Sequence, residues 1–561
     1  MSSRPAFDHR KYRPFVPLAM RDRTWPDQVI TAAPRWCSVD LRDGNQALIE
    51  PMNVAQKLQL FKLLVAVGFK EIEVGFPAAS QPDFDFVRHL IEHDLIPADV
   101  TVQVLTQARP ELIERSFEAL AGARRAIMHL YNSTSVVQRR DVFGLDRDGI
   151  TRIATDGARL VLECARRHPG TEWVFQYSPE SFTGTEIEYA VEICNAVTDV
   201  WQPTPARPCI LNLPSTVEMA TPNIYADQIE WFCRHVKRRD SVIVSLHTHN
   251  DRGCAVAAAE LAVMAGAQRV EGTLLGNGER TGNMDIVTMA MNLYSQGIDP
   301  ALDLSNMDEI IRCVKACTQL PVHPRHPYAG ELVFTAFSGS HQDAIKKCLG
   351  KRAPTDPWDV AYLPIDPTDI GRTYQEVIRI NSQSGKGGVA YVLEQQAGFD
   401  LPRWLQIDFS GVIQQHAEQT ATEVDPQTIV ALFEAQYLAR RAPLELVSYQ
   451  VTREQDEDRL QATLRDGAAS ATVQGRASGV IGAFVAALEQ HCGMRIVVVE
   501  YSEHTLSVGA GADAVAYVQL NLDGQRYCGV GRSSDIIEAS IRAILSAVNQ
   551  KLAGGAARIA A

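Results

Sequence analysis

Eight short apolar segments rich in β-branched and aromatic residues recur through the first 280 residues, at a spacing of about 30 residues. They are Trp36–Asp40, Glu71–Phe76, Thr101–Thr106, Ala126–Leu130, Trp173–Tyr177, Pro208–Leu213, Val242–Leu246 and Arg269–Leu275. Between them lie stretches with helical periodicity, among them Asn53–Val67, Gly149–Arg167, Thr185–Val197, Tyr225–Arg238 and Ala255–Ala265. Strands that alternate with helices in this way are typical of parallel βαβ units. Eight such units favour a (β/α)8 barrel over an open sheet.

The chain has 561 residues, which is too long for a single hydrophobic core. We expect an N-terminal extension at 1–35, the barrel at 36–325, a linker subdomain at 326–390, a second, helical linker subdomain at 391–442 and an α+β domain at 443–561. The stiff, Pro-rich segment Pro321–Tyr328 marks the end of the barrel.

The C-terminal part contains a weak internal repeat. Val473–Ser478 precedes the apolar helix Val480–Leu488, and Val530–Ser534 precedes the helix Ile536–Val548, with Ser534 or Asp535 as the N-cap. Segments of β character are Leu444–Thr452, Gln461–Val473, Arg495–Ser502 and Ala514–Leu522. Two such units in tandem predict a small pseudo-twofold α+β module. We expect a binding or effector domain here; a purely structural dimerisation domain is the alternative.

Charge and cysteine usage limit the partners and the compartment. The net charge is −13, from 54 basic and 67 acidic residues, which argues against nucleic acid or an anionic membrane as a partner. Met1–Arg23 has no apolar core of a signal peptide, and the longest apolar run, Ala255–Ala267, is too short to span a bilayer. The eleven cysteines form no CxxC pair. We therefore expect a cytoplasmic protein with unpaired thiols.

Two histidines end the seventh apolar segment. Alternate residues of a strand share one face, so His247 and His249 point the same way. Neutral imidazole is the commonest metal ligand, so the pair suggests a metal site. The alternative is a hydrogen-bonded histidine pair without a metal.

Polar residues also follow the other predicted strands, where a barrel places its active site. Closure of the barrel brings strand 8 beside strand 1, so Asp43, His247, His249 and Asn283 can meet around one ion. This set of N and O donors lacks cysteine, which favours a catalytic divalent ion over structural zinc. Such an ion acts as a Lewis acid and polarises a carbonyl group.

The remaining polar groups at this end fit a small 2-oxo acid. Arg42 can clamp a carboxylate, and His129, Ser178 and Thr216 approach from strands 4, 5 and 6. Ordinary strand-end capping is the alternative for any one of these three. The acidic residues near the cation are Glu180 and Glu279. For both we favour orientation of the ligands over direct ligation; ion pairing with Arg280 is the alternative.

Three motifs carry a family resemblance. Leu41–Gln46 with the later Lys57, Leu246–Gly253 and Gly276–Asn283 resemble the three signatures of the 2-isopropylmalate synthase/homocitrate synthase family. Flanking segments resemble its long 2-isopropylmalate synthase branch: Arg13–Phe15, Asp22–Pro26, Trp36–Asp43, His323–Tyr328, Ser338–Asp343, Gly371–Tyr374 and Gly531–Ser540. The resemblance covers essentially the whole chain.

The resemblance implies an acyltransferase of leucine biosynthesis. It would condense acetyl-CoA with 2-oxoisovalerate (3-methyl-2-oxobutanoate) and hydrolyse the thioester, giving 2-isopropylmalate and CoA. A divalent ion (Mg, Mn or Zn) is implied, with a monovalent cation such as potassium as an activator. By motif, Asp43, His247 and His249 are its ligands, and Asn283 binds directly or through water.

The same resemblance assigns the other residues. Arg42, His129, Ser178 and Thr216 would contact the oxo acid, with Glu180 close by. His341 and Tyr374 resemble residues that a partner subunit delivers, which implies a homodimer with active sites completed in trans. His341, alone or with Glu180, is the candidate base or water activator, and Tyr374 the candidate acid. The C-terminal repeat resembles a leucine-binding feedback domain.

Four other functions remain open at this point. Citramalate synthase and homocitrate synthase share the metal site, but a homocitrate pocket should offer a cation to the second carboxylate. No extra Arg or Lys stands in His129–Thr134 or Ser178–Glu180. A 3-hydroxy-acyl-CoA lyase would lack the long C-terminal region. An amino-acid-sensing binding protein on an inactive barrel is the non-enzymatic alternative.

Overall fold

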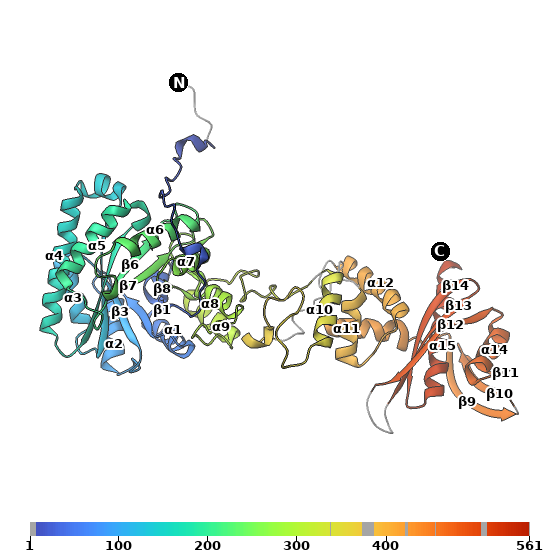
Figure 1. Ribbon diagram of the computed structural model, residues 1–561. Helices are drawn as coiled ribbons and strands as arrows, with labels where there is room; N and C mark the ends of the chain where they lie inside the picture. The colour runs from blue at the N-terminus through green and yellow to red at the C-terminus, as the bar shows by residue number, and fades with distance from the viewer. Residues whose placement is uncertain are drawn as a thin grey trace. The chain divides into compact units, whose positions relative to one another are not determined.

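The computed structural model describes residues 7–336, 338–372, 386–420, 424–454, 456–506 and 513–559. They divide into two compact units (Figure 1). The first contains the residues up to 333 together with 369–371, and the second contains residues 334–368 and those from 372 onward. Among the described residues, no helix combines the length and the apolar content that a bilayer span requires.

Eight parallel strands close the barrel of the first unit, as predicted. They are β1 (Arg35–Ser38), β2 (Glu71–Gly75), β3 (Thr101–Gln107), β4 (Arg125–Ser133), β5 (Glu172–Glu180), β6 (Cys209–Ser215), β7 (Val242–Thr248) and β8 (Arg269–Gly272). Closure is visible at Cys37 of β1, which pairs with Glu71 of β2 on one side and with Glu271 of β8 on the other. Closure therefore brings the first and last strands together at the same level of the barrel.

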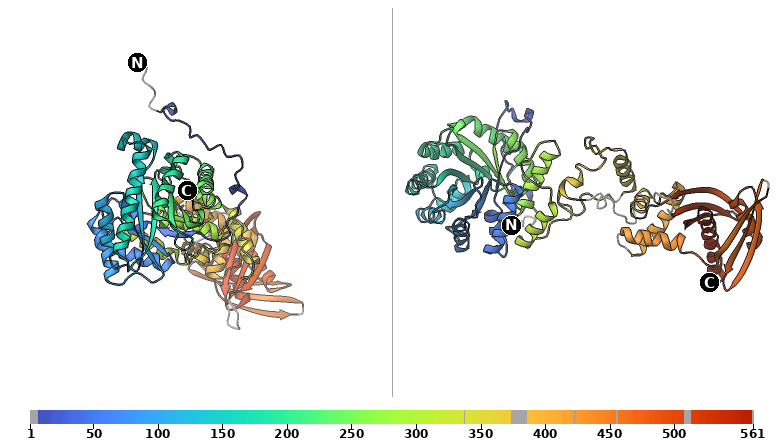
Figure 2. Two further views of the ribbon diagram at one scale, coloured as in Figure 1. Left: turned by 60° about the vertical axis from the view of Figure 1, so that its left-hand side comes forward. Right: turned by 90° about the horizontal axis from the view of Figure 1, so that it is seen from below.

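Helices surround the strands on the outside (Figures 1 and 2). They are α1 (Val54–Val67), α2 (Gln81–Glu92), α3 (Pro110–Ala119), α4 (Arg147–Arg167), α5 (Ile187–Trp201), α6 (Pro222–His235), α7 (Ala255–Met264), α8 (Ile286–Tyr294) and α9 (Met307–Thr318). Their ends follow local sequence: α1 begins at a capping box of Asn53 and Gln56 and ends at Gly68, whose φ is 112°.

Short helical turns join several of these elements. They are η1 (His9–Lys11), η2 (Trp25–Asp27), η3 (Asp40–Gly44), η4 (Gln138–Phe143), η5 (Phe182–Gly184), η6 (Arg239–Ser241), η7 (Leu274–Gly276), η8 (Pro367–Ile370) and η10 (Glu434–Leu438). The turn η2 ties the N-terminal extension to α6, because Trp25 Nε1 donates to Asp227 at 2.7 Å.

The second unit begins with helices. They are α10 (Gly339–Lys351), α11 (Lys386–Ala397), α12 (Arg403–Thr420) and α13 (Pro426–Phe433). An aromatic cluster forms part of their core: the rings of Phe399 and Phe409 lie 4.9 and 5.1 Å from that of Phe433, and Tyr437 lies 5.2 Å from it. These contacts link α12 and α13 with η10.

Two βββα halves follow, in agreement with the predicted repeat. The first contains β9 (Leu444–Glu454), β10 (Glu457–Asp466), β11 (Ala469–Ala477) and α14 (Val480–Cys492). The second contains β12 (Ile496–Thr505), β13 (Ala514–Leu522), β14 (Gln525–Ser533) and α15 (Ile536–Ile559). Each half forms a three-stranded antiparallel sheet, and the two halves share one hydrophobic core.

Two strand predictions in this region were wrong. Gln461–Val473 was expected as one segment, but the chain turns at Gly467 (φ 61°) and forms two strands. The strand β14 was not expected; it follows a tight turn at Asp523 and Gly524, which have φ of 51° and 88°. Both turns contain Asp-Gly, the sequence that favours a hairpin turn with positive φ.

Candidate active site and metal centre

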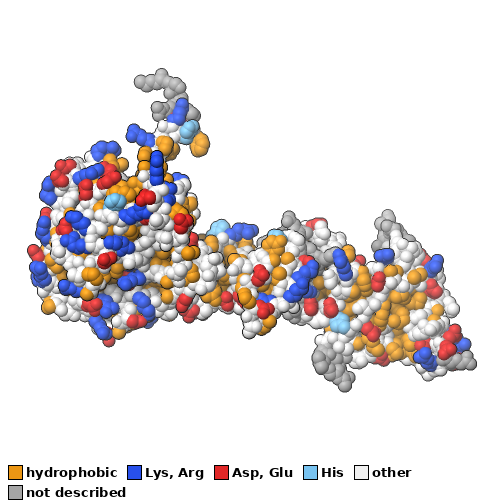
Figure 3. Space-filling model, viewed as in Figure 1, with side chains coloured by type: hydrophobic (Ala, Val, Ile, Leu, Met, Phe, Trp, Pro, Cys, Tyr) orange, Lys and Arg blue, Asp and Glu red, His pale blue; other side chains and the backbone are white. Residues whose placement is uncertain are grey.

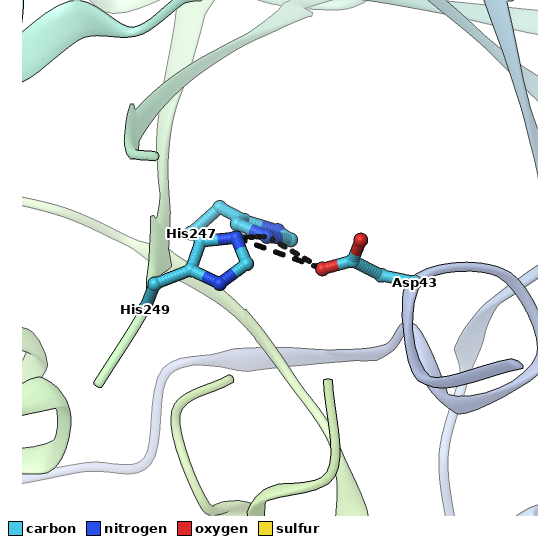
Figure 4. Close-up of side chains that lie close together, drawn as sticks. All are labelled: Asp43, His247 and His249. Carbon is cyan, nitrogen blue, oxygen red and sulfur yellow. Dashed lines mark hydrogen bonds and ion pairs between the residues drawn. The ribbon is translucent and has the colours of Figure 1, made fainter. Parts of the chain in front are cut away.

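Three side chains converge where the barrel closes (Figure 4). Asp43 Oδ2 lies 3.2 Å from His247 Nε2 and 3.7 Å from His249 Nε2. The two Nε2 atoms are 3.3 Å apart, and all three side chains are buried. One nitrogen from each ring and one carboxylate oxygen lie within 4.8 Å of one another, so this triad fits a divalent metal ion.

Local structure places each member of the triad. Directly after β1 the chain forms η3, a wide π-helical turn that buries Arg42 and Asp43 at the carboxyl end of the barrel. His247 belongs to β7, and His249 follows it and forms a backbone bridge with Asn283. The alternation expected of a strand therefore holds through His249.

The protonation of the triad reflects an excess of negative charge. Burial opposes protonation of His247, but its hydrogen bonds to Asp43 and Glu271 outweigh burial and raise its pKa to about 9. Burial and the neighbouring His247 lower the pKa of His249 to about 4. For Asp43, burial is outweighed by Arg42 and His247, which hold its pKa well below the usual range. The site thus attracts a cation.

Hydrogen bonds link the triad to the opposite wall of the barrel. Arg42 Nη1 donates to Asp43 at 2.8 Å, and Arg42 Nε donates to Glu73 of β2. Glu73 Oε2 lies 2.9 Å from Nδ1 of His129, whose Nε2 lies 2.7 Å from Ser178 Oγ. The predicted oxo-acid residues Arg42, His129 and Ser178 therefore belong to one connected network.

The network returns to the metal triad through two more residues. Asn212 Nδ2 donates to Ser178 Oγ at 3.0 Å and to Glu271 Oε2 at 3.2 Å. Glu271 Oε2 in turn lies 2.9 Å from His247 Nδ1. Together with Arg42, Asp43, Glu73, His129, Ser178 and His247, these residues form a closed ring of hydrogen bonds.

Sequence reasoning assigned no role to Glu73, Asn212 or Glu271. The available signal was the alternation of polar residues within otherwise buried strands, as in Glu71-Ile-Glu73 and Arg269-Val-Glu271. Every second residue of a barrel strand points to the interior, so such residues face one another there.

A cavity of about 210 Å³ opens at this end of the barrel. Its walls include nine of the predicted site residues: Arg42, Asp43, His129, Ser178, Glu180, Thr216, His247, His249 and Glu279. Apolar side chains also line it: Phe76, Leu105 and Pro214. The structure therefore brings most of the predicted residues to one small pocket.

Glu180, Thr216 and Glu279 lie at the outer part of this pocket. Glu180 is held by the hydroxyl of Ser133 and by Gln138 Nε2. Thr216 Oγ1 accepts a hydrogen bond from the backbone N–H of Ser181 at 3.0 Å, which leaves its hydroxyl hydrogen for another acceptor. Glu279 accepts a hydrogen bond from Gln46 at 3.3 Å.

Asn283 lies in a tightly folded loop after β8. Its Oδ1 is buried and has no hydrogen-bond partner among the described residues, as expected of an atom kept for a ligand or water. Glycines permit the loop: Gly282 has φ 98°, and a Cβ there would lie 2.0 Å from the carbonyl oxygen of Gly276.

The structure describes one of the two residues expected from a partner subunit. His341 belongs to the second unit, in the first turn of α10, where its ring stacks on Tyr362 with 3.8 Å between centroids. It is not among the described residues that line the cavity. Tyr374 lies outside the described residues.

Family models match three consecutive parts of the chain. HMGL-like matches residues 33–314, the alpha-isopropylmalate synthase post-catalytic domain matches 331–394, and the LeuA allosteric (dimerisation) domain matches 423–552. The 2-isopropylmalate synthase of Parafrankia sp. is 58% identical over 96% of this chain and 97% of its own length. That of Rhodospirillum rubrum is 57% identical over 96% of this chain and 98% of its own.

The chain belongs to the 2-isopropylmalate synthase family. The resemblance drawn from the three motifs is therefore confirmed. The 2-isopropylmalate synthase of Azotobacter vinelandii, at 57% identity, likewise covers 97% of this chain and 97% of its own length. The likeness to the 2-isopropylmalate synthase family thus includes the second unit as well as the barrel.

Proposed function

We propose that this chain condenses acetyl-CoA with 3-methyl-2-oxobutanoate and, after hydrolysis of the thioester, releases 2-isopropylmalate and CoA. The observation that carries the proposal is the buried Asp43, His247 and His249 triad, which opens into a pocket with Arg42, His129 and Ser178. Membership of the 2-isopropylmalate synthase family supports the choice of reaction.

Asp43, His247 and His249 would hold a divalent ion, with Asn283 as a fourth ligand or bound through water. A bound divalent ion would supply a Lewis acid for the ketone oxygen of the oxo acid. Imidazole with oxygen donors suits zinc, manganese or, more weakly, magnesium. Potassium as an activator rests on the family resemblance alone.

The charge of the pocket fits an oxo acid with one carboxylate. Two buried guanidiniums, Arg42 and Arg269, face three buried carboxylates, Asp43, Glu73 and Glu271. Glu71 also pairs with Arg269, so the carboxylates outnumber the guanidiniums and leave no surplus positive charge for a second substrate carboxylate. The two cations that line the cavity are both engaged: Arg42 by Asp43 and Glu73, and Arg280 by Asp251. A homocitrate-type substrate would need a further cation.

The oxo acid would be held by three kinds of contact. Arg42 donates from Nε to Glu73 and from Nη1 to Asp43 within the ring of hydrogen bonds, which leaves Nη2 for the substrate carboxylate. Ser178 and Thr216 offer hydroxyl groups, and Phe76 and Leu105 offer an apolar wall for the isopropyl group. Pyruvate, the substrate of citramalate synthase, would leave that wall unfilled.

We propose that His341 removes a methyl proton of acetyl-CoA, assisted by Glu180, and that Tyr374 acts as an acid. The position of Glu180 in the wall of the pocket supports its part in this step. The test is the pH profile of kcat/KM for His341→Ala and Glu180→Gln. Loss of a titrating limb in either variant supports the assignment of that residue, and an unchanged profile in both removes them from proton transfer.

A homodimer would complete the pocket with the partner's linker. Large apolar side chains stand exposed near the barrel mouth, among them Val136, Val137, Val217 and Met219, and the ends of β4 and β6 precede them. Figure 3 also shows hydrophobic side chains gathered over the C-terminal strands, where Val447, Val497, Val499 and Tyr501 are exposed. Such patches are typical of subunit contacts.

The C-terminal module contains a cavity of about 400 Å³, which we propose as the binding site for leucine as an effector. Isoleucines 481, 536, 537, 541 and 544 line it, together with Glu503 and the first residues of α14 and α15. The isoleucines would surround an aliphatic side chain, Glu503 would face the ammonium group, and helix N-termini would face the carboxylate. Glu503→Gln should weaken leucine inhibition while leaving kcat without leucine unchanged.

The decisive test of the proposed reaction is CoA release with a panel of 2-oxo acids. We expect the highest kcat/KM with 3-methyl-2-oxobutanoate. Preference for pyruvate or 2-oxoglutarate would assign the chain to citramalate or homocitrate synthesis. Leucine binding without CoA release from any member of the panel would favour the amino-acid-sensing alternative.

A further inference from the structure

Glu271 occupies the centre of the hydrogen-bond ring. Its side chain is completely buried within β8, and five donors converge on it. Oε2 accepts from His247 Nδ1 at 2.9 Å and from Asn212 Nδ2 at 3.2 Å. Oε1 accepts from Arg269 Nη1 and Gln176 Nε2, both at 2.7 Å, and from Gln103 Nε2 at 3.2 Å. Only an ionised carboxylate accepts from so many donors at once.

This arrangement determines which nitrogen of His247 is available. In the neutral ring that metal binding requires, Nδ1 keeps the proton that Glu271 accepts, so the lone pair is on Nε2. That atom faces Asp43 Oδ2 at 3.2 Å and His249 Nε2 at 3.3 Å. Without the carboxylate, the proton could equally reside on Nε2 and block it as a ligand.

We propose that Glu271 is a positioning residue for the metal centre: it fixes the tautomer and the ring orientation of His247, so that Nε2 is preorganised as a ligand. The inference rests on the proposed metal site, and nothing in the family resemblance assigned this residue. Glu271 is not among the described residues that line the cavity, so its effect should appear in metal affinity.

The substitution Glu271→Gln tests the proposal because it keeps the shape of the side chain and replaces one acceptor oxygen with a donor NH2 group. Arg269, Gln176 and Gln103 donate to the Oε1 side, so the new amide carbonyl should stay there. The amide NH2 group then replaces Oε2 and faces His247 Nδ1. A donor at that place favours the tautomer with the proton on Nε2, which opposes metal binding.

Glu71→Gln is the matched control. Glu71 is the other carboxylate that pairs with Arg269, through Nε, and among the described residues it forms no hydrogen bond or ion pair with the triad. Both variants remove one negative charge from the surroundings of the same buried guanidinium. Only Glu271→Gln changes the partner of His247. A difference in metal affinity between the two variants therefore separates the positioning of His247 from the general cost of leaving Arg269 with one carboxylate fewer.

The measurement is the affinity of the metal-free full-length protein for Zn²⁺, by competition with a chromophoric chelator, and for Co²⁺, by its visible absorption. We expect Glu271→Gln to raise Kd roughly 10- to 100-fold and Glu71→Gln to change it less than about twofold. An unchanged affinity in Glu271→Gln, or an equal loss in Glu71→Gln, would overturn the proposal. A parent protein that binds neither ion would instead contradict the proposed metal site.

The parent protein supplies a second measurement if Glu271→Gln does not fold. A crystal structure of the zinc-loaded parent should show zinc on His247 Nε2, with Nδ1 still hydrogen-bonded to Glu271. Zinc bound to Nδ1, or Glu271 turned away from the ring, would overturn the proposal.

Discussion

At the scale of single residues, buried charge decides the behaviour of the barrel mouth. Asp40, at the start of η3, accepts hydrogen bonds from Ser38 Oγ and the backbone N–H of Leu274. Burial and, more weakly, the charge of Asp285 nevertheless raise its pKa to about 7. Asp40 is therefore protonated in the folded state at pH values where an unfolded chain has already lost this proton.

This raised pKa predicts a pH-dependent stability. The contribution of Asp40 is fully present below about pH 4 and is lost as the pH rises through about 7, by about 1.4 kcal/mol per pH unit. The variant Asp40→Asn does not titrate. We expect the Tm of the parent, relative to that of Asp40→Asn, to fall between about pH 4 and about pH 7 in calorimetry and to level off above that. A difference in Tm between the two proteins that stays constant over this range would contradict the raised pKa of Asp40.

The residue scale also shows how far sequence reasoning reaches. His247 and His249 could be assigned because strand alternation is local, and closure of the barrel then brings Asp43 to them. Glu271 could not be assigned a role in this way, because a single glutamate in a buried strand does not indicate which histidine it will contact. Its partner is decided by register between β7 and β8, where His247 pairs with Glu271. That register is a tertiary property.

At the scale of elements, the fold of the C-terminal module depends on hairpin turns and on close packing of its sheets against its helices. The hairpin was missed because β14 itself is only weakly apolar, although the apolar β13 and an Asp-Gly turn precede it. The fold also depends on glycines that let sheets approach helices. A Cβ on Gly475 of β11 would lie 2.1 Å from the carbonyl oxygen of Ala483 in α14, and one on Gly529 would lie equally close to that of Ala543 in α15.

We predict that Gly475→Ala destabilises the second unit by about 1–3 kcal/mol or more, because the sheet and α14 must separate. The matched control is Gly411→Ala in α12, where a Cβ meets nothing within 4 Å. Alanine should stabilise that helix by up to about 1 kcal/mol. Thermal unfolding should therefore shift in opposite directions for the two variants; a shift of the same sign would contradict the packing described.

At the scale of the whole molecule, the second unit is expected to serve the barrel of its partner. The barrel supplies the proposed metal ligands, whereas His341 belongs to the second unit. If active sites form in trans, a heterodimer of Asp43→Asn and His341→Ala contains one barrel with intact ligands that receives an intact His341.

Coexpression of these two impaired variants should therefore restore activity. Random pairing makes half of the dimers mixed, each with one intact site, so we expect about a quarter of the parent's kcat per chain. The control is each variant alone, which should keep only its low residual activity at the same metal concentration. No activity above the sum of the two variants in verified heterodimers would contradict completion in trans.

The central claim is that a divalent ion on Asp43, His247 and His249 activates the oxo acid. The direct test is CoA release from acetyl-CoA and 3-methyl-2-oxobutanoate by protein freed of metal and then reloaded. We expect chelation to reduce kcat by roughly 100-fold or more, with recovery at one equivalent of zinc or manganese per chain. Turnover at the parent rate in protein verified to hold no metal would contradict the account.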